Sequence, residues 1–289
     1  MATEQRWAEI AIMASGDAAQ EAIGAVITEV VGIAGYAATA QTVTTYLPVD
    51  ERLENTLLTL KAALTDVKRV HKIPGSSDEI TVRFVAEEDW ATAWKQYFKP
   101  QKIGTRIVVK PTWEAYDAEP DDVVIEIDPG MAFGTGLHAT TRLCLTGLET
   151  HVFAGASVAD VGTGSGILAV AAILLGAGSA VAVDNDPLAV RIAAENVSFN
   201  GVSSQVNVYE AAEPPPGQFD IVVANILAHI ILALAAPLFA ATKAGGVLIT
   251  SGILAGASAE QVAAGLTKAG FRETQIVTEG EWASVVARA

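Results

Sequence analysis

The sequence predicts an α/β protein in which a doubly wound, Rossmann-like domain follows a small α+β domain of the ferredoxin-like kind. Two observations predict the larger domain. From Val158 onward, short apolar runs typical of buried parallel strands alternate with helical patterns, and a glycine-rich turn joins the first strand to a helix. A third observation predicts the smaller domain, because residues 1–85 show the order strand, helix, strand, strand, helix, strand.

The elements of the smaller domain follow from local patterns. Apolar residues recur at helical spacing after Asp17, and Pro48 to Asp50 form a helix start before a second, leucine-rich helix. The predicted strands cover 7–13, 35–40, 41–47 and 79–85, and the predicted helices cover 17–32 and 53–64. No catalytic constellation lies in residues 1–85, so we expect this domain to recognise a substrate.

Residues 86–112 are predicted to link the smaller domain to a second domain that covers residues 113–289. The linker is expected to hold one helix and one strand. Its helix carries three aromatic side chains on one face, at Trp90, Trp94 and Phe98. These side chains either pack the two domains together or form one wall of a substrate site.

The segment from Glu114 to Asp128, which follows a predicted strand at 106–110, carries seven carboxylates and no basic residue. A run of like charge is typical of a solvated segment. We therefore expect a loop here.

A glycine-rich turn organises the larger domain. After a short apolar strand the chain reads Asp160-x-Gly162-x-Gly164-x-Gly166, and an apolar helix follows. Glycine has no Cβ, so such a turn can adopt positive φ and let a ligand lie against bare backbone. A second apolar strand ends in Asp184, about 20 residues farther on, where a carboxylate suits a ribose diol. The pattern predicts a site for an adenosine-containing ligand.

Two classes of adenosine ligand fit this turn. The stretch from Gly164 to Ala169 matches the dinucleotide pattern G-x-G-x-x-G/A, so an NAD-dependent oxidoreductase is one alternative. A pyrophosphate is an anion, so it binds best at a helix N-terminus that has no carboxylate nearby. A sulfonium is a cation, so the carboxylate of Asp160 near the turn does not oppose its binding. The frame resembles the first motif of class I S-adenosylmethionine-dependent methyltransferases. We therefore predict S-adenosylmethionine as the cofactor, contacted by Asp160, Gly162, Gly164, Gly166 and Asp184.

A second glycine loop, at residues 128–141, precedes this turn in the chain. Glycines and turn residues surround one phenylalanine, a costly arrangement in a plain connector, and a standard dehydrogenase has no place for it. We expect it to fold over the cofactor as a lid. The cofactor contacts predicted from it are Phe133, Gly134, Thr135, Gly136 and Thr141. Its histidine, His138, is either structural or a general base.

This loop resembles the D-P-G-x-A-F-G-T-G-x-H-x-T-T signature of the bacterial PrmA family, and the N-I-L-A sequence that starts at Asn225 is similar to another family motif. Leu137 and Ala139 depart from it, since family members usually carry Thr and Pro there. The resemblance implies an S-adenosylmethionine-dependent N-methyltransferase that modifies lysine side-chain and/or N-terminal amines of large-subunit ribosomal protein L-eleven (L11). A related eukaryotic group shares the A-F-G-T-G loop and methylates lysines of a mitochondrial flavoprotein. Another protein or a small-molecule amine therefore remains an alternative substrate.

Asn225 is the candidate catalytic residue and a further cofactor contact. An amide cannot act as a base, but its carbonyl can accept amine hydrogens and aim the nitrogen lone pair at a methyl group. The alternative is that Asn225 only caps the following helix. The strand ends at Asp160, Asp184 and Asn225 all fall on the carboxyl edge of the predicted sheet, where such folds bind ligands. The remaining elements are expected at 187–197, 206–209, 219–224, 246–250, 257–269, 271–277 and 282–287.

Composition narrows the class of partner. The chain has 289 residues and a net charge of −15, which disfavours direct nucleic-acid binding and favours a basic protein. One cysteine, Cys144, forbids an internal disulfide and fits a reducing cytoplasm, and the four scattered histidines give no metal-ligand spacing. No uninterrupted apolar run reaches about 20 residues, and the N-terminus has no signal-like core. We expect a cytoplasmic monomer without metal or membrane attachment.

Overall fold

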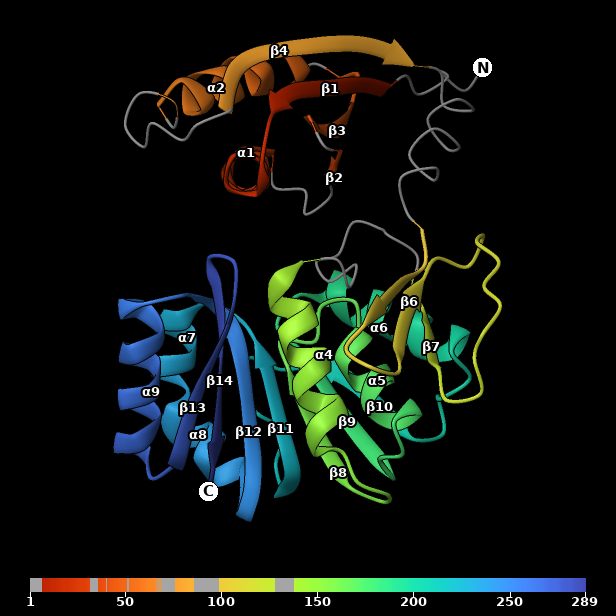
Figure 1. Ribbon diagram of the computed structural model, residues 1–289, viewed down its shortest axis with the longest axis vertical. Coiled ribbons are helices and arrows are strands. Elements are labelled where there is room, and N and C mark those ends of the chain that lie inside the picture. The colour runs from red at the N-terminus through yellow and green to blue at the C-terminus, as the bar shows by residue number, and fades with distance from the viewer. Residues whose placement is uncertain are drawn as a thin grey trace. The chain divides into compact units, whose positions relative to one another are not determined.

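The computed structural model describes residues 7–31, 36–39, 41–50, 52–66, 68, 76–85, 99–127 and 138–289 (Figure 1). The described residues fall into two compact units, one ending at Lys99 and the other beginning at Pro100. The predicted linker helix, with Trp90, Trp94 and Phe98, lies outside the described residues. So does the part of the glycine loop that holds Phe133, Gly134, Thr135 and Gly136.

The N-terminal unit has the ferredoxin-like order that the sequence predicts. Its elements are β1 (Trp7–Ala14), α1 (Asp17–Val31), β2 (Ala37–Ala38), β3 (Thr42–Pro48), α2 (Leu53–Asp66) and β4 (Ser76–Val85). They form one sheet of order β2-β3-β1-β4 whose paired strands are all antiparallel. Alternate residues of β1, among them Ile10 and Ile12, are buried against Ile23 of α1 and Leu60 of α2. This alternation fixes the register, because a slip of one residue would turn the apolar face of β1 to solvent.

The C-terminal unit contains the predicted doubly wound sheet. Its strands are β8 (Ser157–Val161), β9 (Ser179–Asp184), β10 (Val206–Glu210), β11 (Phe219–Asn225), β12 (Thr242–Leu254), β13 (Arg272–Glu279) and β14 (Trp282–Arg288). They lie in the order β10-β9-β8-β11-β12-β14-β13. The first five are parallel, and β14 and β13 form the antiparallel hairpin predicted at the end of the chain.

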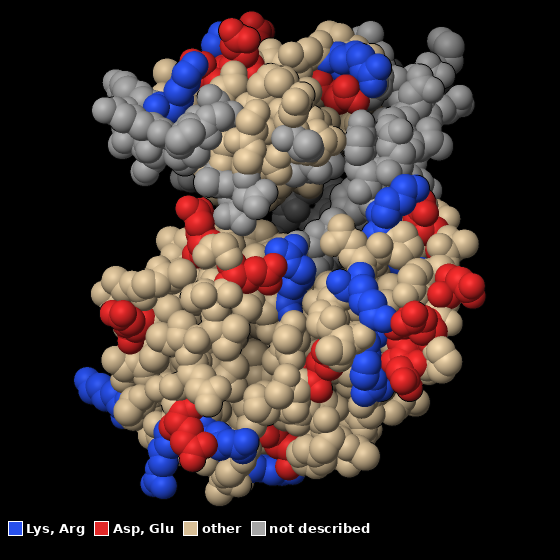
Figure 2. Space-filling view, viewed as in Figure 1, with Lys and Arg blue, Asp and Glu red and all other residues tan. Residues whose placement is uncertain are grey.

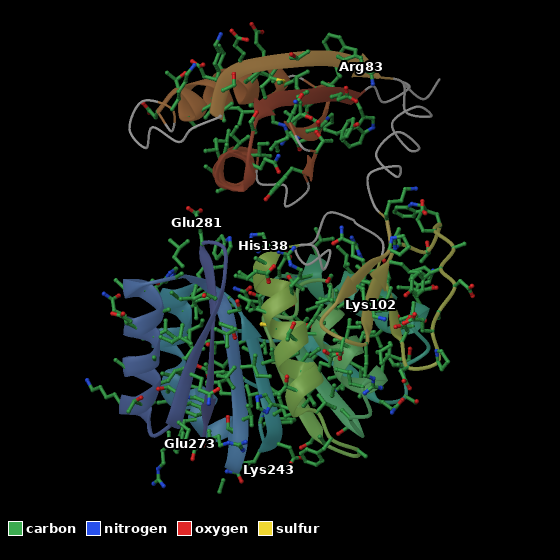
Figure 3. All side chains as sticks on the ribbon, in the orientation of Figure 1. Arg83, Lys102, His138, Lys243, Glu273 and Glu281 are labelled. Atoms are coloured by element: carbon green, nitrogen blue, oxygen red, sulfur yellow. The ribbon has the colours of Figure 1, made fainter. Side chains whose placement is uncertain are left out.

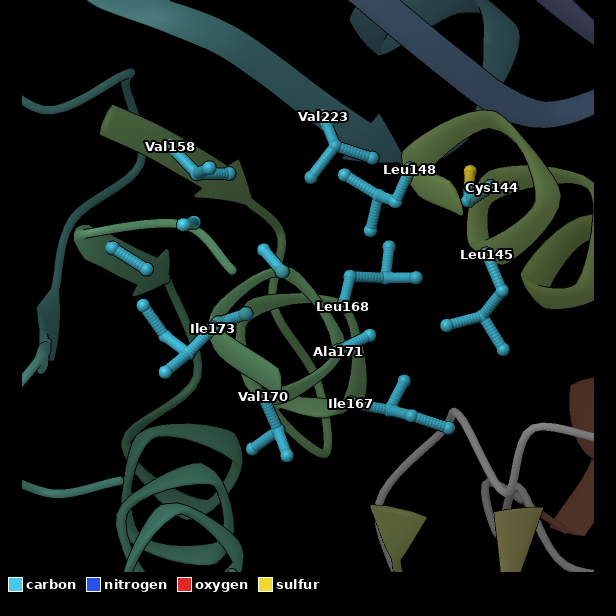
Figure 4. Close-up of a cluster of buried hydrophobic side chains, with 14 of the residues drawn as sticks. Cys144, Leu145, Leu148, Val158, Ile167, Leu168, Val170, Ala171, Ile173 and Val223 are labelled. Carbon is cyan, nitrogen blue, oxygen red and sulfur yellow. The ribbon is translucent and has the colours of Figure 1, made fainter. Parts of the chain in front are cut away.

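Two apolar cores hold helices against the two faces of this sheet. The helices are α4 (Ala139–His151), α5 (Ile167–Leu174), α6 (Pro187–Phe199), α7 (Ala228–Ala233), α8 (Ala235–Ala241) and α9 (Ala257–Ala269). Figure 1 shows α4, α5 and α6 on one side and α7, α8 and α9 on the other. Helix α5 is buried almost all round, so it sits at the centre of the first core, where Leu168 and Ile173 pack among strand and helix side chains (Figure 4).

The sheet order places a topological switch point between β8 and β11. The chain leaves β8 toward β9 on one side and later returns as β11 on the other. Ligands bind in the crevice that such a reversal opens at the carboxyl ends of the strands. The candidate residues Asp160 and Asn225 lie at this edge, on the two strands that flank the switch point.

The prediction of a loop from Glu114 to Asp128 is wrong in part. The segment contains β7 (Val123–Glu126), which pairs in parallel with β6 (Ile107–Lys110), and β5 (Gln101–Ile103) completes a three-stranded sheet. Within this segment the side chains of Val123, Ile125 and Ile127 are buried. The acidic neighbour Asp122 pairs with Lys102 (Oδ1 to Nζ, 2.9 Å), which lowers the pKa of Asp122 to about 2. Lys102 also binds Glu119 at 2.8 Å, so the carboxylates that suggested solvent are partly neutralised by a lysine outside the segment.

None of the described helices is both long enough and apolar enough to cross a membrane.

Candidate active site

The glycine-rich turn runs between β8 and α5 with three glycines at positive φ. The φ angles are 73° at Gly162, 55° at Gly164 and 81° at Gly166, a region where other residues are strained. The amides of Gly162 and Thr163 both donate to the Val183 carbonyl oxygen at 2.9 Å, which ties the turn to the neighbouring strand β9. The Gly166 amide donates to the Thr163 carbonyl at 2.9 Å and closes the turn where α5 begins.

Two of these glycines are also required by close packing. A Cβ at Gly162 would lie 2.3 Å from Cγ2 of Ile226, which follows β11. A Cβ at Gly166 would lie 3.1 Å from Cα of Ala193 in α6. The turn is thus fitted between β11 on one side and α6 on the other, and a larger residue would displace one of them.

Asp160 lies beneath the turn and is fully buried. Its Oδ2 accepts hydrogen bonds from the Thr163 hydroxyl at 2.6 Å and the Ala169 amide at 3.2 Å. Its Oδ1 has no hydrogen-bond partner among the described residues. Burial and, to a smaller extent, the charge of Asp184 raise the pKa of Asp160 to about 7, against the lowering effect of those two hydrogen bonds.

Asp184, at the end of β9, holds the glycine turn from the side. Its Oδ2 accepts the Gly164 amide at 2.9 Å, and its Oδ1 accepts the Asp186 amide at 3.0 Å. Each carboxylate oxygen keeps a second lone pair that a ribose hydroxyl can use. Asp186 caps α6 by accepting the Leu188 amide at 2.8 Å, with Pro187 in the first turn, as the sequence predicts.

Asn225 ends β11, and its side chain reaches α4. The Nδ2 group donates to the Thr141 hydroxyl at 3.4 Å. The Oδ1 atom is buried, and the described part of the chain offers it no donor. The alternative in which Asn225 caps the next helix is wrong, because Leu227 occupies the N-cap position of α7. Among the described residues, the amide oxygen is therefore a buried acceptor without a hydrogen-bond partner, at the carboxyl edge of the sheet.

His138 caps the N-terminus of α4. Its Nδ1 lies 2.8 Å from the Thr140 hydroxyl and accepts the Thr140 amide at 3.4 Å. The ring meets the Trp282 ring edge to face, with centroids 4.8 Å apart. Burial lowers the pKa of His138, and the charge of Arg142 lowers it further. Of the two roles left open by the sequence, these contacts support the structural one.

The described residues form a small, partly open cavity of about 20 Å³ against the glycine turn. It is lined by Thr141, Gly162, Thr163, Gly164, Ile167, Leu168 and Asn225. Four of these were candidates from the sequence. Among the other candidates, Asp160 lies behind Thr163, Gly166 packs on α6, and Asp184 positions Gly164.

Sequence reasoning missed Thr163 and Ile226. Thr163 links the buried Asp160 carboxylate to the cavity, and its place between two glycines of the turn was the available signal. Ile226 covers Gly162 and gave no signal, because its role depends on a contact between two different strand ends.

Comparison with known proteins places these motifs in a family. The profile of the family described as ribosomal protein L11 methyltransferase (PrmA) matches residues 6–289. A protein named ribosomal protein L11 methyltransferase from Pelotomaculum thermopropionicum is 50% identical over 245 residues, 84% of this chain and 78% of that protein. One of the same name from Geobacter metallireducens is 46% identical over 256 residues, 87% of this chain and 83% of that protein.

A similar solved structure is that of a ribosomal protein L11 methylase from Lactobacillus delbrueckii subsp. bulgaricus. It is 33% identical, has a TM-score of 0.60, and the match covers 66% of this chain and 98% of that one.

Proposed function

The chain belongs to the ribosomal protein L11 methyltransferase (PrmA) family, and on that premise we propose that it methylates lysine side-chain and/or N-terminal amines of ribosomal protein L11. It is an S-adenosylmethionine-dependent protein N-methyltransferase, and the alternative of an NAD-dependent oxidoreductase is set aside. The experiment below distinguishes methylation of L11 from methylation of another protein or of a small-molecule amine.

The chemistry of the described residues suits this cofactor. Gly162 and Gly164 line the cavity with bare backbone, Asp184 keeps lone pairs for ribose hydroxyls, and Thr141 borders the same space. We assign these residues to cofactor binding, together with Asp160 and Gly166, which support the turn from behind. Phe133, Gly134, Thr135 and Gly136 keep the lid role predicted from the sequence. When bound, S-adenosylmethionine supplies an activated methyl group on a sulfonium.

The unpartnered Oδ1 of Asn225 is the observation on which the catalytic assignment rests. A lysine amine has an ordinary pKa of about 10.4 and must be neutral to act as a nucleophile. Asn225 Oδ1 accepts one hydrogen of the neutral amine and thereby directs the nitrogen lone pair into the cavity. The Nδ2 group donates to the Thr141 hydroxyl, which supports the assignment of the carbonyl oxygen, rather than the amino group, to the substrate amine.

Charge and domain order support a basic protein as the substrate. The chain carries −15 overall, which complements a small basic partner such as L11. Figure 2 shows acidic and basic side chains interspersed on the face in view, so the complementarity is one of net charge rather than of a single acidic patch there. We assign substrate docking to residues 1–85, and we place the enzyme in the cytoplasm as a monomer without direct nucleic-acid contact.

The test is incubation of the full chain with isotopically labelled S-adenosylmethionine and purified large-subunit ribosomal proteins, followed by mass spectrometry. Label on lysine or N-terminal amines of L11 is the expected result. Label on a different ribosomal protein would keep the chemistry and overturn the substrate. Label on no protein, with turnover of free amines, would favour a small-molecule substrate.

A further inference from the structure

Asp160 is a buried carboxyl group that methyl transfer itself does not use. It is fully buried on β8, it forms no ion pair within the described residues, and its Oδ1 has no hydrogen-bond partner there. A carboxylate removed from water in this way is costly unless a cation or several donors compensate it. Two donors, Thr163 and Ala169, reach only the other oxygen.

Among the described residues, the groups that face Asp160 do not supply a compensating positive charge. On β11 and β9 its register neighbours are Val223 and Ala182, which are apolar. From α4 it is approached by the buried thiol of Cys144, whose pKa is raised by burial and by the Asp160 charge. From the end of β9 the Asp184 carboxylate repels a second negative charge and raises the pKa of Asp160. These surroundings favour the neutral acid.

A cationic ligand bound against the glycine turn changes this balance. The cavity is lined by Thr163, whose hydroxyl lies 2.6 Å from Asp160 Oδ2, so the carboxyl group is one side chain away from the ligand space. A positive charge held beside this buried carboxyl group favours its ionised form. A neutral ligand of the same shape does not.

We propose that Asp160 holds a proton while the site is empty, releases it when the sulfonium cofactor binds, and thereby distinguishes the cationic cofactor from the neutral thioether product. The O–H bond of the acid breaks, its electron pair stays on Asp160, and the proton leaves to solvent past the Thr163 hydroxyl. Once the methyl group has moved to the amine, the sulfur is neutral, and Asp160 takes up a proton from solvent again. The inference rests on the proposed use of this site and makes Asp160 a specificity-determining residue.

The protonation change of Asp160 would aid turnover by weakening the binding of the product. Cofactor binding and proton release are coupled, so the ionised Asp160 contributes attraction only while the ligand is cationic. After transfer the attraction disappears, which weakens the complex with S-adenosylhomocysteine. Affinity for S-adenosylmethionine should fall as the pH is lowered, whereas affinity for S-adenosylhomocysteine should change little.

The direct test is isothermal titration calorimetry of the full chain in buffers that differ in ionisation enthalpy. At pH 6.5 we expect S-adenosylmethionine to release about three-quarters of a proton, the protonated fraction of a carboxyl group whose pKa is about 7. S-adenosylhomocysteine should release close to none. The dissociation constant for S-adenosylmethionine should be about fivefold larger at pH 6 than at pH 7. The α-amino group of the ligand stays largely protonated in this range, because an α-amino group has a pKa of about 7.7–8.0.

Variants separate Asp160 from other titrating groups. Asp160→Asn should abolish proton release and reduce the preference for S-adenosylmethionine over S-adenosylhomocysteine. Asp186→Asn is the matched control, because it removes a carboxylate two residues beyond Asp184 while asparagine preserves the cap of α6. It should release the same number of protons as the native chain.

If Asp160→Asn does not fold, a measurement on the native chain alone still tests whether Asp160 loses its proton. An infrared difference spectrum should show the loss of one protonated-carboxyl band when S-adenosylmethionine binds, and no loss with S-adenosylhomocysteine. Equal proton release with the two ligands, or binding heat without proton release, would overturn the inference and leave the proposed function intact. Absence of any binding heat with S-adenosylmethionine would overturn the cofactor assignment instead.

Discussion

The two edges of the seven-stranded sheet each hold an aspartate beside a cavity, but the two carboxyl groups are in opposite states. At the amino edge, Asp220 Oδ2 accepts hydrogen bonds from Lys243 Nζ at 2.9 Å and from the Ser157 amide and hydroxyl at 2.8 and 2.7 Å. Burial opposes ionisation there, but these donors lower the pKa of Asp220 to about 2. At the carboxyl edge, Asp160 has no cationic partner among the residues that the structure describes, and its pKa is raised to about 7.

The difference is the reason why we place the candidate site by the state of its polar groups rather than by cavity size. The cavity beside Asp220 and Lys243 measures about 340 Å³, against about 20 Å³ at the glycine turn. Figure 3 shows Lys243 at one end of the C-terminal unit and His138 at the other. The larger cavity is lined by a carboxylate whose partners are already in place. The smaller one adjoins an amide carbonyl and a carboxyl oxygen that lack partners within the described ranges, and a substrate amine and a cationic cofactor can satisfy such groups.

The largest expected difference between the edges is in catalysis. Asn225→Ala should lower kcat by about 10²–10³-fold, as expected for loss of a hydrogen-bonding group at the reacting atoms, while changing cofactor affinity far less. Steady-state methylation of purified L11 at saturating substrate measures kcat, and calorimetry measures the cofactor affinity. The exposed Asn207 on β10 provides the control, since Asn207→Ala should react at the native rate. Unchanged turnover in Asn225→Ala would remove the catalytic assignment.

The second difference is between two glycines with nearly the same backbone. Gly162 has φ 73° and Gly245, near the start of β12, has φ 78°, but only Gly162 has a neighbour that an added Cβ would strike. Gly245→Ala should lower the free energy of unfolding by about 1 kcal/mol, the cost of a left-handed alanine. Gly162→Ala should cost about 3 kcal/mol, because overpacking against Ile226 adds to this. Urea unfolding of both variants measures these losses in the free energy of unfolding. Equal losses in the two variants would contradict the close packing of Gly162 against Ile226.

An element of the fold could be predicted from the sequence when the interactions that form it lie within a few residues of one another. The glycine turn, the cap at Asp186 and the helix of residues 257–269 were predicted because spacing and capping chemistry lie within a few residues of one another. Strand β7 was missed because its flanking carboxylates suggested solvent, whereas Lys102, from another strand, neutralises Asp122. A partner that is distant in sequence leaves no mark on the local pattern.

The site shows the same limit. Asn225 and Asp184 could be chosen from their places at strand ends, because parallel strands bring those ends to one edge. That Asn225 Oδ1 lacks a partner, and that Thr141 holds the other end of the amide, depends on how α4 packs on β11. The raised pKa of Asp160 likewise depends on burial beneath that helix and the turn. Residue types were predictable, whereas their charge and hydrogen-bond states required the tertiary structure.

A smaller loss is expected at the ribose position. Asp184→Ala removes the acceptor proposed for the ribose and the acceptor of the Gly164 and Asp186 amides, so cofactor binding should weaken by about 1.5–3 kcal/mol. Calorimetry with S-adenosylhomocysteine isolates this effect from proton release at Asp160. Asp186→Asn again serves as the control and should bind as tightly as the native chain. Native affinity in Asp184→Ala would mean that Asp184 only ends its strand.

The smallest expected effect is a loss of stability on substitution of Asp220 at the amino edge, and it should leave cofactor binding and methylation unchanged. Because the pKa of Asp220 is lowered from 3.8 to about 2 in the folded chain, its ionised form stabilises the fold above about pH 4, and this contribution is lost as the pH falls through about 2. Its side chain is 25% exposed, so solvent screening reduces the contribution, and Asp220→Asn should lower the free energy of unfolding at pH 7 by about 1 kcal/mol. The difference from the native chain should shrink between pH 4 and pH 2 in urea unfolding, while cofactor affinity and methylation stay native. Asp160 has the opposite sign: its raised pKa means that the folded chain binds the proton more tightly than the unfolded chain, so its ionisation destabilises the empty fold as the pH rises toward 7. If Asp220→Asn impaired cofactor binding, or if its loss of stability did not shrink in acid, the two edges would not be separated by the ion pairing described above.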